Sequence, residues 1–352
     1  MTGTVGARPA SRRTRAVELI DDRLGLKALQ YPVPEHANNL GWSLGGITAA
    51  VLFILIATGM ILTQFYNPTP EAANASVRHI LANVWAGRFI RSLHYWTAQA
   101  MYVLAVLHLL RVFFTGSYKR PREANWLIGV SMLALVTGAL FTGTVLKWDQ
   151  EGFEALGHNL ELARLLGGAG FWFTPRFAAD IPLLERLYVA HVVILPGLLL
   201  GLFAIHGALI KRHGISPSPT VPDAPGEAKE PFTHHVRRVG AFALVLFALV
   251  GALAIVRPPG VGATPVEGIE VTKPLWMFWW LFTLENKIGL KGILYGAGAL
   301  FALLFAVPFI DRKPQRWWRK RPVAMSIAGL VLVIITVLTI MEALTTPASH
   351  LG

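Results

Sequence analysis

Seven apolar stretches of about 19 to 23 residues, separated by polar and charged segments, organise this chain of 352 residues. Each stretch is about long enough to cross ~30 Å of hydrocarbon as an α-helix. A further apolar patch at 275–284 is too short to be a crossing of its own. The pattern therefore predicts an all-α integral membrane protein with seven transmembrane helices, near 43–65, 92–114, 126–146, 188–209, 238–256, 291–310 and 324–343.

A proline-rich segment divides these helices into two groups. The stretch GISPSPTVPDAPGEAKEPFTHH, residues 214–235, contains five prolines and predicts an extended, solvated linker. Within the polar N-terminal segment, DDRLGLKALQYPVPEHANN predicts a short amphipathic helix at the membrane surface, with Leu24, Leu26 and Leu29 as its apolar positions. The expected organisation is an N-terminal segment (1–42), a four-helix module (43–212), the linker (213–237) and a three-helix module (238–352).

The distribution of basic residues predicts the orientation. If the N-terminus is cytoplasmic, the inner segments carry 19 Lys and Arg and the outer segments carry 10. The positive-inside rule then places the N-terminus in the cytoplasm and the C-terminus outside. The net charge of +12 is accordingly a topology signal with some affinity for anionic lipid, and it does not indicate nucleic-acid binding. The first apolar stretch is a full-length span, so no cleavable signal peptide is expected.

Four histidines inside the predicted spans are the strongest chemical signal. His94 and His108 are 14 residues apart, and His191 and His206 are 15 apart. On an α-helix these spacings are about 21 to 22 Å, with the two rings within roughly 60° of one face. Both helices run from outside to inside, so His94 meets His191 (the outer pair) and His108 meets His206 (the inner pair). Ionisable groups within a membrane are costly and usually functional.

Two facing imidazoles are suitable axial ligands for a haem iron, and two such pairs would stack two haems across the bilayer. Zinc would need further ligands at each level. The alternative interpretation is a set of interhelical hydrogen bonds or a proton path. The chain contains no cysteine, which excludes thiolate-bound iron–sulfur clusters, disulfides and thioether-linked haem within it.

Glycines and arginines accompany the histidines at the same period. Gly45 and Gly59 in the first span, and Gly129 and Gly143 in the third, are also 14 residues apart, which would leave room for a flat macrocycle at each level. Close helix packing is the alternative explanation. Arg91 and Arg111 each lie three residues outside a histidine, where they could pair with haem propionates or anchor the helix at the interface.

The chain resembles cytochrome b of the Rieske/cytochrome b complexes over nearly its whole length. The stretches that carry the resemblance are LGGITAAVLFILIATG, RSLHYW, GSYKRPREANWLIG, LKWDQ, ERLYVAHVVILPG, HGIS, KPLW and PFIDR. The resemblance implies that the outer pair ligates a low-potential haem b and the inner pair a high-potential one. The spacing in the fourth span resembles the plastid-type subunit, with its two separate chains fused here.

Two departures from the family pattern concern function. Ser43 stands where the plastid-type subunit has a cysteine that holds a further haem, so covalent attachment is not expected. The quinol-oxidation motif Pro-Glu-Trp-Tyr is altered to Pro274, Leu275, Trp276 and Met277, and Thr144 and Lys147 alter a second motif in GTVLKW. Without the motif carboxylate, the outer quinol site is impaired, or a nearby acid such as Glu285 or Asp149 takes the proton; Glu285 could equally occupy a solvated surface position.

The resemblance implies a subunit of a quinol:cytochrome c, or plastocyanin-like, oxidoreductase that uses two non-covalent haems b and a quinone. It also implies a Rieske iron–sulfur protein and a c-type cytochrome as partners, a homodimeric complex and a location in the bacterial inner membrane. A second hypothesis is a di-haem conduit between another donor or acceptor and an inner quinone site. A third, of another class, is a transporter or scaffold with no redox role.

Overall fold

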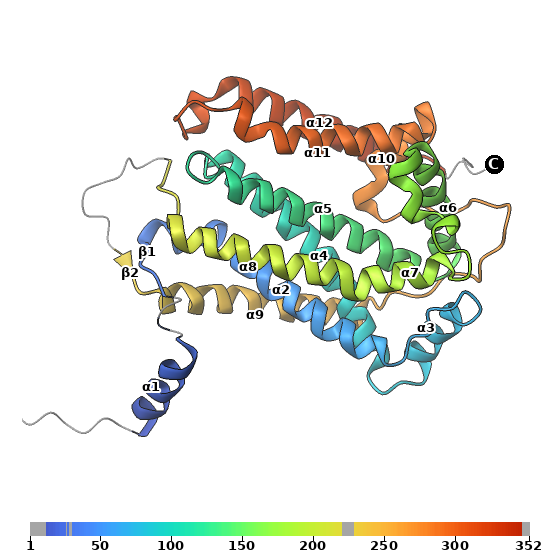
Figure 1. The fold of residues 1–352 in the computed structure, drawn as a ribbon, viewed down its shortest axis with the longest axis horizontal. Coiled ribbons are helices and arrows are strands. Elements are labelled where there is room, and N and C mark those ends of the chain that lie inside the picture. Colours follow the sequence, from blue (N-terminus) through green and yellow to red (C-terminus); the bar gives the residue numbers. More distant parts are fainter. Residues whose placement is uncertain (1–11, 26, 28–29, 220–228, 347–352) are drawn as a thin grey trace, which may run out of the picture.

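Seven long apolar helices dominate the fold and lie side by side (Figure 1). The structure, a computed structural model, describes residues 12–25, 27, 30–219 and 229–346. The long helices are α2 (Leu40–Thr63), α4 (Gly87–Phe114), α5 (Glu123–Val145), the continuous helix made by α7 (Leu183–Val189), a π-helical turn (Ala190–Ile194) and α8 (Leu195–His213), then α9 (Phe232–Val256), α11 (Lys291–Ile310) and α12 (Pro322–Leu344). The predicted fold class and its seven spans are confirmed.

The shorter elements lie at the two ends of the long helices (Figure 1). Strands β1 (Val33–Pro34) and β2 (Lys229–Glu230) pair antiparallel, with Val33 opposite Glu230. The remaining helices are α1 (Arg12–Leu24), α3 (Ala73–Ala82), α6 (Gln150–Leu165) and α10 (Trp279–Ile288), with 3₁₀ turns at Glu35–Ala37, Gly167–Phe173, Pro175–Phe177, Trp276–Phe278 and Trp318–Lys320. The apolar patch at 275–284 thus forms a 3₁₀ turn and a short helix.

The N-terminal helix lies earlier in the chain than the sequence pattern indicates. It ends at Leu24, because Gly25 adopts a left-handed conformation (φ 61°) and its amide donates to the Asp21 carbonyl over 2.7 Å. The sequence pattern predicts a short amphipathic surface helix within DDRLGLKALQYPVPEHANN; Leu24 ends α1, Leu26 and Leu29 lie outside the described residues, and the location of a helix at the membrane surface stays a prediction. The middle of the expected linker, 220–228, also lies outside them.

The first four spans pack as two pairs, α2 along α4 and α5 along α8. Helix α9 lies against α2 and α4, whereas α11 lies against α5, and α10 contacts both α11 and α12 near their ends (Figure 1). The central core contains side chains of α2, α4, α5, α8 and the 3₁₀ turn before α10: Val51, Leu52, Met101, Val136, Leu140, Leu199 and Met277. Helices α4 and α9 begin at Gly87 and Phe232, several residues before the apolar stretches predicted at 92–114 and 238–256.

At the end of the bundle nearest the linker, a buried polar network joins the connection after α4 to the connection between α11 and α12. Lys119 Nζ lies 2.7 Å from Asp311 Oδ1, and Arg321 Nε donates to Asp311 Oδ2 over 2.8 Å. Tyr118 donates to the same carboxylate, and Arg321 also reaches the Phe113 carbonyl. The basic groups beside Asp311 hold the pKa of its carboxyl below the ordinary value, although burial opposes them.

Candidate functional site: two histidine pairs and the cavities beside them

The outer histidine pair lies between α4 and the π-helical turn. The ring centroids of His94 and His191 are 6.3 Å apart, with 66° between the ring planes. His191 occupies the single π turn of its helix, a local distortion that is frequent at functional sites. A cavity of about 290 Å³, here called the histidine cavity, is lined by both rings and by Arg91 and Tyr95.

Two threonines orient these rings. Thr58 Oγ1 and Thr142 Oγ1 each lie 2.9 Å from Nδ1 of His94 and His191, respectively. Each hydroxyl also donates its single proton to a carbonyl four residues earlier, at 2.7 and 2.9 Å. It therefore accepts from Nδ1–H, which leaves Nε2 unprotonated and able to bind a metal. Sequence reasoning missed both threonines, although each directly precedes one of the periodic glycines.

The inner pair lies about 21 Å further along α4, since His108 follows His94 by 14 residues. The ring centroids of His108, on α4, and His206, on α8, are 6.5 Å apart at 74°. Nδ1 of both rings is buried and has no hydrogen-bond partner among the described residues. The rings of His94 and His191 therefore face each other, as do those of His108 and His206, which is the pairing predicted from the sequence.

Each predicted glycine lies directly behind one histidine ring. A Cβ atom at Gly45 would lie 2.9 Å from Cε1 of His108, and one at Gly143 would lie 3.0 Å from Cε1 of His191. At Gly59 and Gly129 the corresponding distances are 3.4 Å to His94 and 3.7 Å to His206. The glycines of α2 thus make room for the rings of α4, and those of α5 for the rings of the π-helical turn and of α8.

The pairs fit a bis-imidazole metal site. An imidazole nitrogen lies roughly 1 Å from its ring centroid and about 2 Å from a bound metal, so two rings on opposite sides of one metal have centroids roughly 6 Å apart. The separations of 6.3 and 6.5 Å match this estimate. Among the described residues, no group of three or more His, Cys, Asp or Glu side chains could hold a metal ion. Two protein ligands at each level suit a metal whose other positions a macrocycle fills.

The two predicted arginines flank the pairs. Arg91 lines the histidine cavity, and its guanidinium donates to the carbonyls of Pro259 (2.6 Å) and Gly260 (3.2 Å). Arg111 donates to the Gly41 carbonyl over 3.2 Å, and its guanidinium lies 4.3 Å from the Trp42 ring centroid. Both arginines retain further N–H donors beyond these contacts.

Two more cavities adjoin the histidine cavity. The first, called the apolar cavity, has about 260 Å³ and lies between α6 and α10, with walls that include His158, Pro274, Phe278 and Phe282. The second, called the polar cavity, has about 460 Å³ and is lined by Arg91, Tyr95, Lys147 and Asp149 together with the chain from 259 to 272. Leu275 lines all three cavities, so the altered motif position lies where they meet.

The neighbours of Leu275 in the motif have structural contacts. Trp276 Nε1 donates to Gln99 Oε1 over 2.8 Å, and the Pro274 carbonyl accepts from Trp279 Nε1 over 2.8 Å. Met277 is buried in the central core. Ser43 is also buried, and its hydroxyl donates to the Asn39 carbonyl over 2.9 Å.

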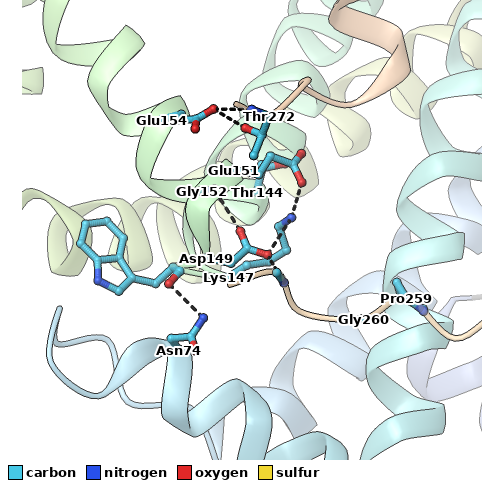
Figure 2. A network of polar contacts seen from close by, with 12 residues as sticks. Asn74, Thr144, Lys147, Asp149, Glu151, Gly152, Glu154, Pro259, Gly260 and Thr272 are labelled. Atoms are coloured by element: carbon cyan, nitrogen blue, oxygen red, sulfur yellow. Dashed lines mark hydrogen bonds and ion pairs between the residues drawn. The ribbon is translucent and has the colours of Figure 1, made fainter. Parts of the chain in front are cut away.

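The carboxylate of Asp149 is occupied by backbone amides. Its Oδ1 accepts from Gly152 N over 3.1 Å, which caps α6, and its Oδ2 accepts from Gly262 N over 2.8 Å (Figure 2). Glu154, one turn further along α6, accepts from the amides of Val271 and Thr272 over 2.9 and 3.0 Å. These two carboxylates fasten the segment 262–272 to α6.

Glu285 is buried, and its interpretation as a solvated surface residue is wrong. It lies on α10, which contacts both α11 and α12, and its side chain is almost fully shielded from solvent. Glu285 Oε1 lies 3.1 Å from His158 Nε2, and Glu270 Oε1 lies 3.2 Å from the same nitrogen. Burial lowers the pKa of His158, but the adjacent carboxylates of Glu270 and Glu285 outweigh it and raise the pKa to about 10. Sequence reasoning missed His158.

The sequence matches known protein families and individual proteins. Residues 99–264 match the family model described as cytochrome b(N-terminal)/b6/petB, and residues 5–124 match one for prokaryotic cytochrome b561. Cytochrome b6 of Heliobacterium mobile is 41% identical over 191 residues, which cover 53% of this chain and 90% of that protein.

A further relative matches most of this chain, including the part after the linker. The cytochrome bc complex cytochrome b subunit of Chlorobaculum thiosulfatiphilum is 32% identical over 330 residues, covering 87% of this chain and 74% of that protein. The menaquinol:cytochrome c reductase cytochrome b subunit of Geobacillus thermodenitrificans is 37% identical over 213 residues, covering 56% and 95%. A solved chain of a hyperthermophilic respiratory Complex III aligns with a TM-score of 0.79 at 21% identity, covering 94% of this chain and 91% of that one, and it supports the fold.

Proposed function

This chain belongs to the cytochrome b family of bc- and b6-type complexes, and from that premise we propose that it carries electrons across the membrane between two haems b in a quinol:cytochrome c reductase-like complex. The observation that carries the proposal is the pair of facing histidines at each of two levels, with a glycine behind every ring. An interhelical hydrogen-bond network does not require the two rings of each pair to face each other with the centroid separations of 6.3 and 6.5 Å that a shared metal would need.

His94 and His191 hold the outer, low-potential haem, and His108 and His206 hold the inner, high-potential one. Haem iron, when bound, accepts and gives up one electron at a time. The protein's contribution is to orient the ligands: Thr58 keeps the proton of its histidine on Nδ1, so that Nε2 is free to bind. Arg91 and Arg111 offer their remaining donors to the propionates.

The apolar cavity is the proposed outer quinol site. Its aromatic and aliphatic walls suit a ring with an isoprenoid tail, and it adjoins the histidine cavity at Leu275. A Rieske iron–sulfur protein and a c-type cytochrome are the proposed partners on the outer side, in a homodimeric complex. A second candidate, a di-haem conduit that does not oxidise quinol at this site, is favoured by the apolar side chain of Leu275, which cannot accept a proton.

The test is to purify the tagged chain in mild detergent with whatever accompanies it. We expect an iron–sulfur protein and a c-type cytochrome to co-purify, and the complex, with a mass that fits two copies of each subunit, to reduce cytochrome c with quinol as donor. Haem without quinol-driven reduction would favour the conduit. A preparation with no Soret absorption would contradict both and leave a transporter or scaffold.

We also propose that the chain lies in the bacterial inner membrane with its N-terminus in the cytoplasm, because the basic residues gather on that side. Protease added to right-side-out vesicles is expected to remove a C-terminal epitope tag and to leave an N-terminal one. In inverted vesicles the susceptibility should be reversed. Loss of the N-terminal tag first in right-side-out vesicles would contradict this orientation.

A further inference from the structure

A carboxylate that sequence reasoning missed lies at the junction of two cavities. Glu151, in the first turn of α6, lines both the apolar cavity and the polar cavity. Leu275 lines the same two cavities. The structure therefore provides an acidic side chain beside the position from which the motif carboxylate is missing.

Of the three acids at the start of α6, Asp149, Glu151 and Glu154, Glu151 is the one whose carboxylate accepts no hydrogen bond from a backbone amide of the described residues. Asp149 and Glu154 use their oxygens to hold the amides of α6 and of the segment 262–272. Glu151 is held instead by one flexible side chain, since Lys147 Nζ lies 2.5 Å from its Oε2 (Figure 2). A lysine contact can break and reform without loss of a helix cap or a loop attachment.

The surroundings of Glu151 favour its protonated form more than water does, which suits a proton acceptor. Its side chain is 22% exposed and that of Lys147 is 17% exposed, so the pair is largely removed from water. Burial raises the pKa of Glu151 above its ordinary value, with the charges of Asp149 and Glu154 adding to the rise and Lys147 opposing it. Tyr95, and Arg91 on the same helix α4, also face the polar cavity. A base works best when its pKa approaches the working pH.

We propose that Glu151 accepts a proton from a quinol hydroxyl in the apolar cavity and releases it into the polar cavity. The inference rests on the proposed function, because it presupposes quinol in the apolar cavity. The step is a proton transfer: the quinol O–H bond breaks, its electron pair stays on the quinol oxygen, and the proton binds a Glu151 carboxylate oxygen. Lys147 positions the carboxylate and favours its ionised form.

The decisive variant is Glu151→Gln in the purified complex, with Glu161→Gln as matched control. Glu161 is also an ion-paired glutamate of α6, with Arg164 as its partner, but it lines none of the three cavities. General-base assistance is typically worth ~10²–10⁴ in rate, so we expect kcat for quinol oxidation to fall at least about 10²-fold in Glu151→Gln. KM, haem content and the Glu161→Gln rates should stay close to those of the parent.

Three further measurements separate proton acceptance from a structural role. The acidic limb of the parental pH–rate profile should disappear in Glu151→Gln, and it should move to higher pH in Lys147→Met, because loss of the cation raises the pKa of the carboxyl. Infrared titration of the complex without substrate should show one protonated carboxyl band that Glu151→Gln lacks. The double variant Glu151→Gln with Leu275→Glu should recover at least tenfold of the lost rate.

Parental rates and pH dependence in Glu151→Gln would overturn the proposal. So would a collapse of the rate in Glu285→Gln with Glu151→Gln unaffected, which would assign the proton to the buried cluster of His158, Glu270 and Glu285. A parent complex that holds haem but does not oxidise quinol would instead overturn the proposed function, and the infrared band would then report only the titration of Glu151.

Discussion

The variant His108→Ala is expected to bind one haem b per chain where the parent binds two. His108 faces His206 with a centroid separation of 6.5 Å, and no other described histidine, cysteine or acidic group forms a cluster that could replace it. Loss of one of the two protein ligands leaves the inner haem held from one side. The outer pair shares no ligand with it, so the second haem should remain.

Pyridine haemochrome analysis of the purified chain measures this stoichiometry. The control is His234→Ala, because His234 is half exposed near the start of α9 and belongs to neither pair. The control should retain two haems, extractable by acidic acetone since Ser43 offers no thiol. Two haems in His108→Ala together with His206→Ala at full occupancy would contradict the assignment of the ligands.

The variant Gly45→Ala is expected to weaken inner haem binding far more than Gly129→Ala. A methyl group at Gly45 would lie 2.9 Å from Cε1 of His108, too close for a carbon–carbon contact, so the ring must shift. At Gly129 the corresponding distance to His206 is 3.7 Å, an ordinary contact. Overpacking of this kind costs roughly 1–3 kcal/mol, which corresponds to about a five- to 150-fold loss of affinity.

Both variants place alanine in a helix, where it is favoured over glycine by about 1 kcal/mol, so helix propensity cannot explain a loss. Gly197→Ala on α8 is a further control, because nothing lies within 4 Å of the added methyl group. Haem content after exposure to a haem scavenger ranks the affinities. Equal retention in Gly45→Ala and Gly129→Ala would show that the glycines do not position the rings.

The spans and the histidine pairing could be predicted because both follow from one-dimensional periods. Hydrocarbon thickness sets the length of the apolar stretches, and the pitch of an α-helix sets the depth of a histidine 14 residues from another. The glycines followed from the same period, but their contact with the imidazole rings depends on which helices are neighbours. Which helices are neighbours is a property of the tertiary structure, and it cannot be read from the spacing of residues along the chain.

The outer end was harder to predict because its short helices have no regular apolar period. Glu285 of α10 is buried beside His158 of α6, which lies far earlier in the chain. Glu151 lines two cavities at the start of α6, where Asp149 and Glu154 fasten the segment 262–272. The two acids in KWDQEG look alike in the sequence, but Asp149 accepts from backbone amides whereas Glu151 pairs with the Lys147 side chain.

The buried network around Asp311 bears on whether this subunit needs to be a single polypeptide. Lys119 precedes the linker, and Asp311 and Arg321 follow it, yet they meet in contacts that involve no linker residue. Trp126 on α5 adds a hydrogen bond to the Leu304 carbonyl of α11, over 2.8 Å. The parts of the chain before and after the linker thus bind each other through their own side chains. The covalent linker ensures that the two parts are made in equal number, but these contacts do not depend on it.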